Sequence, residues 1–217
     1  DKFALSLDIR YQQIYKGDDA PELPEDSYHG EDIAERAKEF AEVCGDRYIS
    51  ESEEVRRKAL VDFALPKNID SMHEILSKYR IEYDTWFKES TLHNGPELHD
   101  TIELLKEKGL TYELDGALWY KNTEVQTKRL LAQGKTQEDI DKLGLKDDVL
   151  IRQNGNPTYF AADIAYHRNK LAIRKFDRAI DIWGADHHGH VARMQGALDA
   201  LGLDGDRLDI VLMQLVR

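Results

Sequence analysis

One stretch of the sequence, residues 178–215, reads RAIDIWGADHHGHVARMQGALDALGLDGDRLDIVLMQL. It contains two short apolar runs, Ala179–Trp183 and Leu208–Leu215, on either side of a longer segment, His190–Leu201, whose apolar residues recur at helical spacing. Parallel strands need a crossover connection, usually a helix, whereas antiparallel strands can be joined by a tight turn. The stretch therefore predicts a strand, a helix and a second strand parallel to the first.

The residues upstream extend this alternation. Val149–Arg152 predicts another strand and Tyr159–Ile173 another helix. Three strands that alternate with helices form a βαβαβ unit, so we expect an α/β protein with a parallel sheet covered by helices. Before this unit, Asp115-Gly116 lies between two apolar stretches and predicts a two-stranded hairpin.

The chain is expected to divide near residue 115. Residues 1–114 are predicted to form a mostly helical insertion or connective region, with apolar residues spaced by three and four. Residues 115–217 are predicted to carry the sheet, and residues 123–146 to form a polar helical insert within this part.

Two features of the first part predict where its elements end. Pro66 predicts the end of a helix, because proline lacks the N–H that a helix interior needs, and Asn68 is then the expected cap of the next helix. Ile81–Thr85 predicts a short strand.

Composition excludes several classes of protein. The 217 residues include 30 basic and 42 acidic side chains, a net charge of −12, which argues against wrapping nucleic acid because phosphate binding needs a basic surplus. The single cysteine, Cys44, excludes a disulfide framework and suits a reducing cytosol, so we expect a cytoplasmic protein. No apolar run approaches the roughly 18 residues of a membrane span.

Ligands of open parallel sheets bind outside the carboxyl ends of the strands, so two loops are candidates for chemistry. In the first, Tyr159 and Asp163 are four residues apart and share one helix face. A carboxylate beside a phenol suits a cation, and guanidinium matches best because its planar fork pairs two N–H donors with two carboxylate oxygens. Alternatively, Asp163 complements the helix dipole and Tyr159 packs in the core, which on spacing alone is the more common arrangement.

The second loop, residues 184–190, allows three interpretations. Gly184 lets the backbone approach a ligand, Asp186 suits the hydroxyls of a ribose, and His190 opens a helix whose N-terminus attracts phosphate. Asp186 and the histidines at 187, 188 and 190 have the chemistry of zinc or manganese ligands. A polar turn without a ligand is the third interpretation, and spacing does not decide between them.

Five longer strings occur in chain order: YHGEDI at 28–33, DGALW at 115–119, TYFAADIAYH at 158–167, RAIDIWGADHHGHVAR at 178–193 and DIVL at 209–212. Together they resemble the arginyl-tRNA synthetases of the bacterial type, which are class I aminoacyl-tRNA synthetases. The resemblance runs along essentially the whole chain, and long strings in the right order are more specific than a lone glycine motif.

The resemblance implies a Rossmann-type catalytic domain in an arginine-tRNA ligase, which activates arginine with ATP and Mg²⁺ and transfers it to tRNA(Arg). By motif position it implies arginine-binding roles for Tyr159, Asp163 and His187. It likewise implies ATP or adenosine contacts for Gly184, Asp186 and His190. No catalytic residue is assigned in this chain and no tightly bound metal is expected; the expected partners are L-arginine, ATP and the tRNA, with no membrane and no DNA.

Two family signatures are not matched in this chain. The His-x-Gly-His signature belongs upstream of the strings above and the Lys-Met-Ser-Lys loop downstream. The string at 187–190 contains similar letters, but it follows a mid-sheet strand and matches a different family segment. Since the sequence also begins at Asp1, we expect the central part of a longer enzyme, inactive alone.

Two other functions stay open. The tripeptide Asp186-His187-His188 names a class of metal-dependent phosphoesterases, although Asp177, Asp181 and Asp209 do not form a convincing set of further ligands. The other is a non-catalytic module that docks protein or RNA on residues 30–110.

Overall fold

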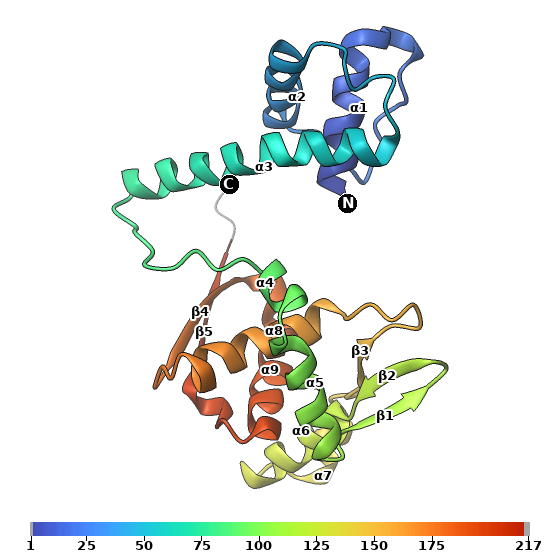
Figure 1. Ribbon diagram of the computed structural model, residues 1–217. Helices are drawn as coiled ribbons and strands as arrows, with labels where there is room; N and C mark the ends of the chain where they lie inside the picture. The colour runs from blue at the N-terminus through green and yellow to red at the C-terminus, as the bar shows by residue number, and fades with distance from the viewer. Residues whose placement is uncertain (1, 215–217) are drawn as a thin grey trace. The chain divides into compact units, whose positions relative to one another are not determined.

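The structure, a computed structural model, describes residues 2–214. The chain forms two units, Asp1–Trp86 and Phe87–Arg217, and each is described here by itself (Figure 1). The division falls earlier than the expected position near residue 115, because a helix upstream of the hairpin packs into the same core as the hairpin and the sheet. Leu215, the predicted end of the last strand, lies outside the described residues.

The first unit consists of three helices, α1 (Lys2–Lys16), α2 (Glu31–Cys44) and α3 (Glu53–Lys78), with a short 3₁₀ turn at Gly17–Asp19. Their apolar faces form one core, which includes Leu7, Tyr11, Ile33, Ala37, Phe40 and Leu60. The Ser52 side chain caps the N-terminus of α3, where it accepts a hydrogen bond from the Val55 N–H at 3.4 Å.

A buried ion pair ties α1 to α3. Asp8 is 1% exposed, and its carboxylate accepts hydrogen bonds from Arg56 Nε at 2.5 Å and from Arg57 Nε at 3.2 Å. A buried carboxylate is costly unless it is paired and hydrogen-bonded, so these two arginines are needed to keep Asp8 inside the unit.

The prediction that a helix ends at Pro66 was wrong, because α3 continues through it to Lys78. Side chains of α2 hold the turn that follows the proline. Arg36 donates from Nε to Asn68 Oδ1 at 2.9 Å and from a terminal nitrogen to Ser71 Oγ at 3.1 Å. These contacts occupy the Asn68 side chain that was expected to cap a new helix, and they offset the one backbone hydrogen bond that proline removes.

The second unit alternates short strands with helices. Its first half comprises α4 (Ser90–Asn94), α5 (Glu97–Glu107), β1 (Thr111–Leu114), β2 (Ala117–Tyr120), α6 (Asn122–Ala132) and α7 (Gln137–Asp141). Its second half comprises β3 (Asp148–Ile151), α8 (Tyr159–Arg168), a π-helical turn (Asn169–Ile173), β4 (Ala179–Gly184), α9 (His188–Leu201) and β5 (Leu208–Met213). Single 3₁₀ turns, Ala185–His187 and Gly205–Arg207, precede α9 and β5.

The α/β class, the hairpin and the parallel strand–helix–strand unit are confirmed. β1 and β2 pair as an antiparallel hairpin, and β4 and β5 pair in parallel with α9 between them in the chain. The first strand of the predicted βαβαβ unit, Val149–Arg152, was misplaced: it corresponds to β3, which pairs antiparallel with β2 in a separate sheet of order β1-β2-β3. β2 pairs with β1 along one edge and with β3 along its other edge. After β3 the chain reverses direction, and Ile151 forms an isolated antiparallel bridge with Pro157. Ile81–Thr85 forms no strand, because it has no partner strand there.

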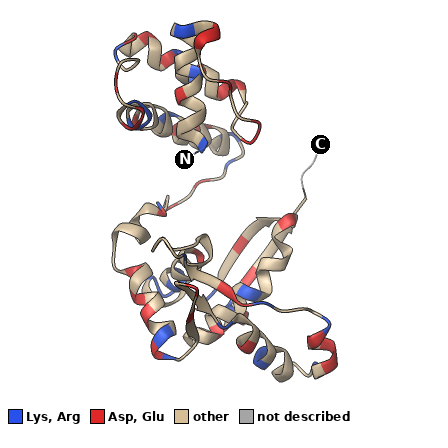
Figure 2. Cartoon of the chain, turned by 90° about the vertical axis from the view of Figure 1, so that its right-hand side faces the viewer, with Lys and Arg blue, Asp and Glu red and all other residues tan. Residues whose placement is uncertain are grey.

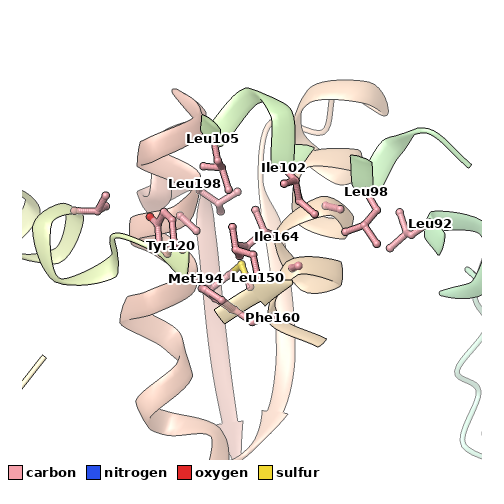
Figure 3. Packing of buried hydrophobic residues seen from close by; sticks show 14 of the residues in the cluster. Leu92, Leu98, Ile102, Leu105, Tyr120, Leu150, Phe160, Ile164, Met194 and Leu198 are labelled. Atoms are coloured by element: carbon pink, nitrogen blue, oxygen red, sulfur yellow. The ribbon is translucent and has the colours of Figure 1, made fainter. Parts of the chain in front are cut away.

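The core of the second unit lies between α5, α8, α9 and the two sheets. Figure 3 shows side chains from these helices pointing into a common interior, where Leu105, Ile164 and Leu198 are fully buried. Tyr120 of β2 and Leu150 of β3 join the same cluster. The core thus fixes α8 and α9 against each other and against the first sheet.

The outer face of the parallel pair is apolar and exposed. Ile180 is 65% exposed and Ile182 71% exposed, although parallel sheets are usually covered on both faces. Acidic and basic residues are interspersed along the helices of both units (Figure 2). In the described part of the chain, no helix is long and apolar enough to cross a membrane.

Replacing Pro66 by alanine tests the continuity of α3. Pro66→Ala restores a backbone N–H within the helix, so we expect slower amide exchange at residues 67–76 and an unfolding free energy of the first unit raised by about 1–3 kcal/mol. Hydrogen exchange and urea unfolding measure the two effects. Pro21→Ala, in an extended loop, is the control and should change neither. Unprotected amides after residue 66 in the unmutated chain would show instead that the helix ends at the proline.

Candidate functional site

A pocket of about 420 Å³ lies at the carboxyl end of β4, between that strand and the first turns of α8 and α9. It is lined by Tyr159, Asp163, Tyr166, His167, Asp181, Ile182, Trp183, Gly184, His187 and His190. The structure therefore gathers five of the six predicted site residues at the sheet edge where they were expected. Asp186 is the exception, because it does not line the pocket.

The side chain of Asp163 projects into this pocket from α8. The helix begins with Thr158, whose hydroxyl accepts the Ala161 N–H at 3.3 Å and so places Asp163 one turn inside the helix. His190 donates from Nε2 to Asp163 Oδ2 at 3.2 Å. The carboxylate side chain is 41% exposed, so its other oxygen can reach a ligand in the pocket.

His167 holds Asp163 from the opposite direction, through the backbone. Its Nδ1 donates to the Asp163 carbonyl at 2.7 Å, and its Nε2 donates to Asp181 Oδ2 at 2.7 Å. A carbonyl and a carboxylate can only accept, so both ring nitrogens carry a proton and the buried ring is an imidazolium ion.

Asp181 of β4 compensates this buried charge. Lys170 donates to its second oxygen, Oδ1, at 2.7 Å. Burial alone would raise the pKa of Asp181, but the hydrogen bonds and charges of His167 and Lys170 lower that pKa to about 2. Asp181 is therefore ionised and shared between two cations.

Aromatic rings form the walls of the pocket. Tyr159 is 61% exposed and its ring centroid lies 5.7 Å from that of His190. Trp183 lies 5.3 Å from the His190 ring, and Tyr166 stacks on Phe87 at 4.3 Å. Because Tyr159 is exposed, the alternative in which it simply fills the core does not hold.

Gly184 ends β4 and lies close to the side chain of Asp186. A Cβ at this position would collide with the carboxylate of Asp186, which folds back toward the strand end. The Asp186 side chain is 82% exposed, and its nearest partner is His187 Nε2 at 3.7 Å. Asp186 therefore lies at the rim, outside the pocket that His187 and His190 line.

Metal coordination receives no support from this loop. Within residues 2–214, no group of three or more His, Cys, Asp or Glu side chains is arranged to hold a metal ion. The string Asp186-His187-His188 does not converge on one point, so the phosphoesterase alternative is not supported.

Several pocket residues were not predicted from the sequence, although signals for them exist. His167 lies four residues after Asp163 and so shares its helix face. Asp181 and Trp183 alternate along β4 and face the same side. Arg193 does not line the pocket but contacts His190, which it follows by three residues, a helical spacing that also could have been used.

No family model matches the chain. Among curated proteins, the arginine–tRNA ligase of Ruminiclostridium cellulolyticum is 51% identical over all 217 residues, and that of Caldanaerobacter subterraneus subsp. tengcongensis is 54% identical. The chain spans only 36% and 35% of the lengths of these relatives.

Solved structures of arginyl-tRNA synthetases also match the chain. A Campylobacter jejuni chain named as an arginyl-tRNA synthetase matches 99% of this chain and 43% of its own length, with a TM-score of 0.77 and 33% identity. The Thermus thermophilus arginyl-tRNA synthetase matches with a TM-score of 0.61 at 17% identity, which shows a shared fold.

The proteins that this chain resembles are aminoacyl-tRNA synthetases. More narrowly, the chain is homologous along its whole length to bacterial arginyl-tRNA synthetases, of which it spans about 36%.

The charge of Asp181 makes the stability of the second unit depend on pH. Its pKa of about 2 in the folded chain lies below the ordinary value of 3.8, so its ionisation stabilises the fold above about pH 4, and this stabilisation is lost as the pH falls through about 2. Asp181→Asn should lower the unfolding free energy by about 2 kcal/mol at pH 7 and by much less at pH 2. Urea unfolding across this range measures the difference.

The matched control is Asp209→Asn, which removes the exposed partner of Arg178. Exposed ion pairs contribute little, so this variant should resemble the unmutated chain at every pH. A pH-independent effect of Asp181→Asn would contradict the assigned charge states.

Proposed function

We propose that this pocket binds the guanidinium group of L-arginine, and that the chain supplies this recognition within an arginine-tRNA ligase of the cytoplasm. The observation that carries the proposal is the unneutralised carboxylate of Asp163 at the mouth of a pocket with aromatic walls. Homology to arginine–tRNA ligases along the whole chain supports the same ligand.

Of the two carboxylates that line the pocket, Asp163 is the one left for a cationic ligand. Asp181 is neutralised by His167 and Lys170, at 2.7 Å each, and so has no charge to spare. Asp163 receives a hydrogen bond on Oδ2 alone among the described residues, from a largely buried histidine. A cationic ligand would thus find one negative group, with one oxygen available.

The shape of the pocket favours a planar cation. The rings of Tyr159, Tyr166 and Trp183 can lie against the flat face of a guanidinium, which stacks on aromatic surfaces more readily than an ammonium does. The fork of the guanidinium can also donate to a carboxylate oxygen and to a nearby hydroxyl at once. His187, 58% exposed at the side chain, stands at the rim, where the amino and carboxyl groups of arginine would lie.

ATP and tRNA(Arg) are the further substrates of the proposed reaction, with Mg²⁺ accompanying the ATP. Gly184 brings the backbone at the carboxyl end of β4 close to the pocket, so an adenosine can approach there, next to His190 and with Asp186 at the rim. The carboxylate of arginine itself would attack the α-phosphate of ATP, and the bond to the β-phosphate would break to release pyrophosphate. The residues of this chain would act by positioning arginine, and we assign none of them a proton transfer or a covalent step.

Changing Asp163 to asparagine tests the proposed ligand. Asp163→Asn keeps the shape and still accepts from His190, but it removes the charge that a guanidinium needs. We expect the affinity for L-arginine to fall about a hundredfold or more, while L-citrulline, which lacks the positive charge, binds weakly to both forms. NMR titration of the isotope-labelled chain with L-arginine, L-citrulline and L-lysine measures these affinities.

Asp177→Asn is the matched control, because Asp177 is exposed and lies outside the pocket. It should leave arginine-induced shifts at Tyr159, Asp163 and His187 unchanged. Equal arginine affinity in Asp163→Asn and the unmutated chain would remove Asp163 from its proposed role.

A further inference from the structure

His190 is the most enclosed polar side chain that faces the pocket from α9. It is 5% exposed and is surrounded by the rings of Tyr159 and Phe160 from α8 and of Trp183 from β4. Both of its ring nitrogens have partners. Nε2 lies 3.2 Å from Asp163 Oδ2, and a terminal nitrogen of Arg193 lies 2.7 Å from Nδ1.

The chemistry of these partners determines where the proton of His190 lies. A guanidinium can only donate, so Nδ1 must accept and carries no proton. A carboxylate can only accept, so the single proton lies on Nε2. The ring is therefore neutral, although a carboxylate is in contact with it.

Arg193 is itself held in place by β3. Its other terminal nitrogen donates to Asp148 Oδ1 at 2.5 Å, which completes a chain from Asp148 through Arg193 and His190 to Asp163. The hydrogen bonds of the Arg193–Asp148 pair are incomplete, because Arg193 Nε and Asp148 Oδ2 are buried without a hydrogen-bond partner among the described residues. The Arg193 side chain is 31% exposed and the Asp148 side chain 17% exposed, and a partly exposed ion pair with unsatisfied atoms adds little stability, which points to a role other than holding the fold together.

We propose that Arg193, anchored by Asp148, is a positioning residue that holds His190 as its neutral Nε2–H tautomer, so that Asp163 is oriented by a hydrogen bond but keeps its full charge for a cationic ligand. The assignment of the tautomer stands on the contacts of His190 alone. The benefit to the ligand rests on the proposed function.

Comparison with His167 shows why the neutral state of His190 matters. It contacts a carboxylate in the same pocket, but both of its partners accept, so it is charged and neutralises Asp181. If His190 were charged as well, Asp163 would be neutralised in the same way and the pocket would lose its attraction for a cation. Arg193 makes the difference by donating to the nitrogen that would otherwise gain a proton.

The tautomer can be measured directly by NMR of the chain labelled with ¹⁵N-histidine, at pH 7.5 and without ligand. The signal of His190 is assigned as the one missing in His190→Asn. We expect a protonated Nε2 and an unprotonated Nδ1. In Arg193→Met, which keeps the length of the side chain but removes its donors, we expect loss of the unprotonated Nδ1 signal. Arg193→Lys, which retains a cationic donor, should restore it partly.

The control is Arg178→Met, which breaks another arginine–aspartate pair, on the surface and outside the pocket. It should leave the His190 signals unchanged. A proton on Nδ1 of His190 in the unmutated chain, or an unchanged tautomer in Arg193→Met, would overturn the proposal. The unmutated spectrum decides the tautomer even if Arg193→Met does not fold, and Asp148→Asn then provides a milder test of the same chain of contacts.

Titration with L-arginine separates this inference from the proposed function. We expect Arg193→Met to bind arginine about tenfold more weakly or worse, since Asp163 then shares its charge with a protonated histidine, whereas Arg178→Met should bind normally. The predicted tautomer without any arginine binding would contradict the proposed function and leave the tautomer assignment standing. Arginine binding with an unchanged affinity in Arg193→Met would contradict the role assigned to Arg193.

Discussion

The hydrogen bonds to Asp163 are the constraint on which the pocket depends. His167 fixes its backbone carbonyl at 2.7 Å and His190 fixes its carboxylate at 3.2 Å, so one residue is held by two histidines from two helices. Each histidine is fixed in turn by charged groups on strands, Asp181 of β4 and, through Arg193, Asp148 of β3. The position of one carboxylate therefore depends on both sheets of the second unit.

This arrangement explains why the core lies where it does. Ile164 of α8 and Leu198 of α9 are fully buried, and they lock the two helices that carry Asp163 and His190. A shift of either helix by a fraction of an ångström would change the contact between these side chains, and close-packed interiors resist such shifts. Apolar packing thus supplies the rigidity, and the polar contacts supply the charge pattern.

Sequence patterns predicted the parallel unit, the hairpin and the place of the pocket, because these depend on local periodicity and on turn residues such as Asp115-Gly116. Sequence patterns failed where contacts with residues far away in the sequence determine the local structure. Arg36 of α2 stabilises the turn after Pro66, and the free edge of β2 captures β3. The protonation of His167 and His190 could not be predicted either, because it depends on partners such as Asp181 and Arg193 that only the fold brings into contact.

The two faces of β4 differ in their side chains and in their exposure. Successive residues of a strand point to opposite faces, so Asp181 and Trp183 face the helices while Ile180 faces outward. On the neighbouring strand Val211 is also exposed, at 44%. Because parallel sheets are normally covered on both sides, this apolar face is suited to contact with further protein. Ile182 is exposed on this outer face and also lines the pocket, so the two surfaces of the strand meet at this residue.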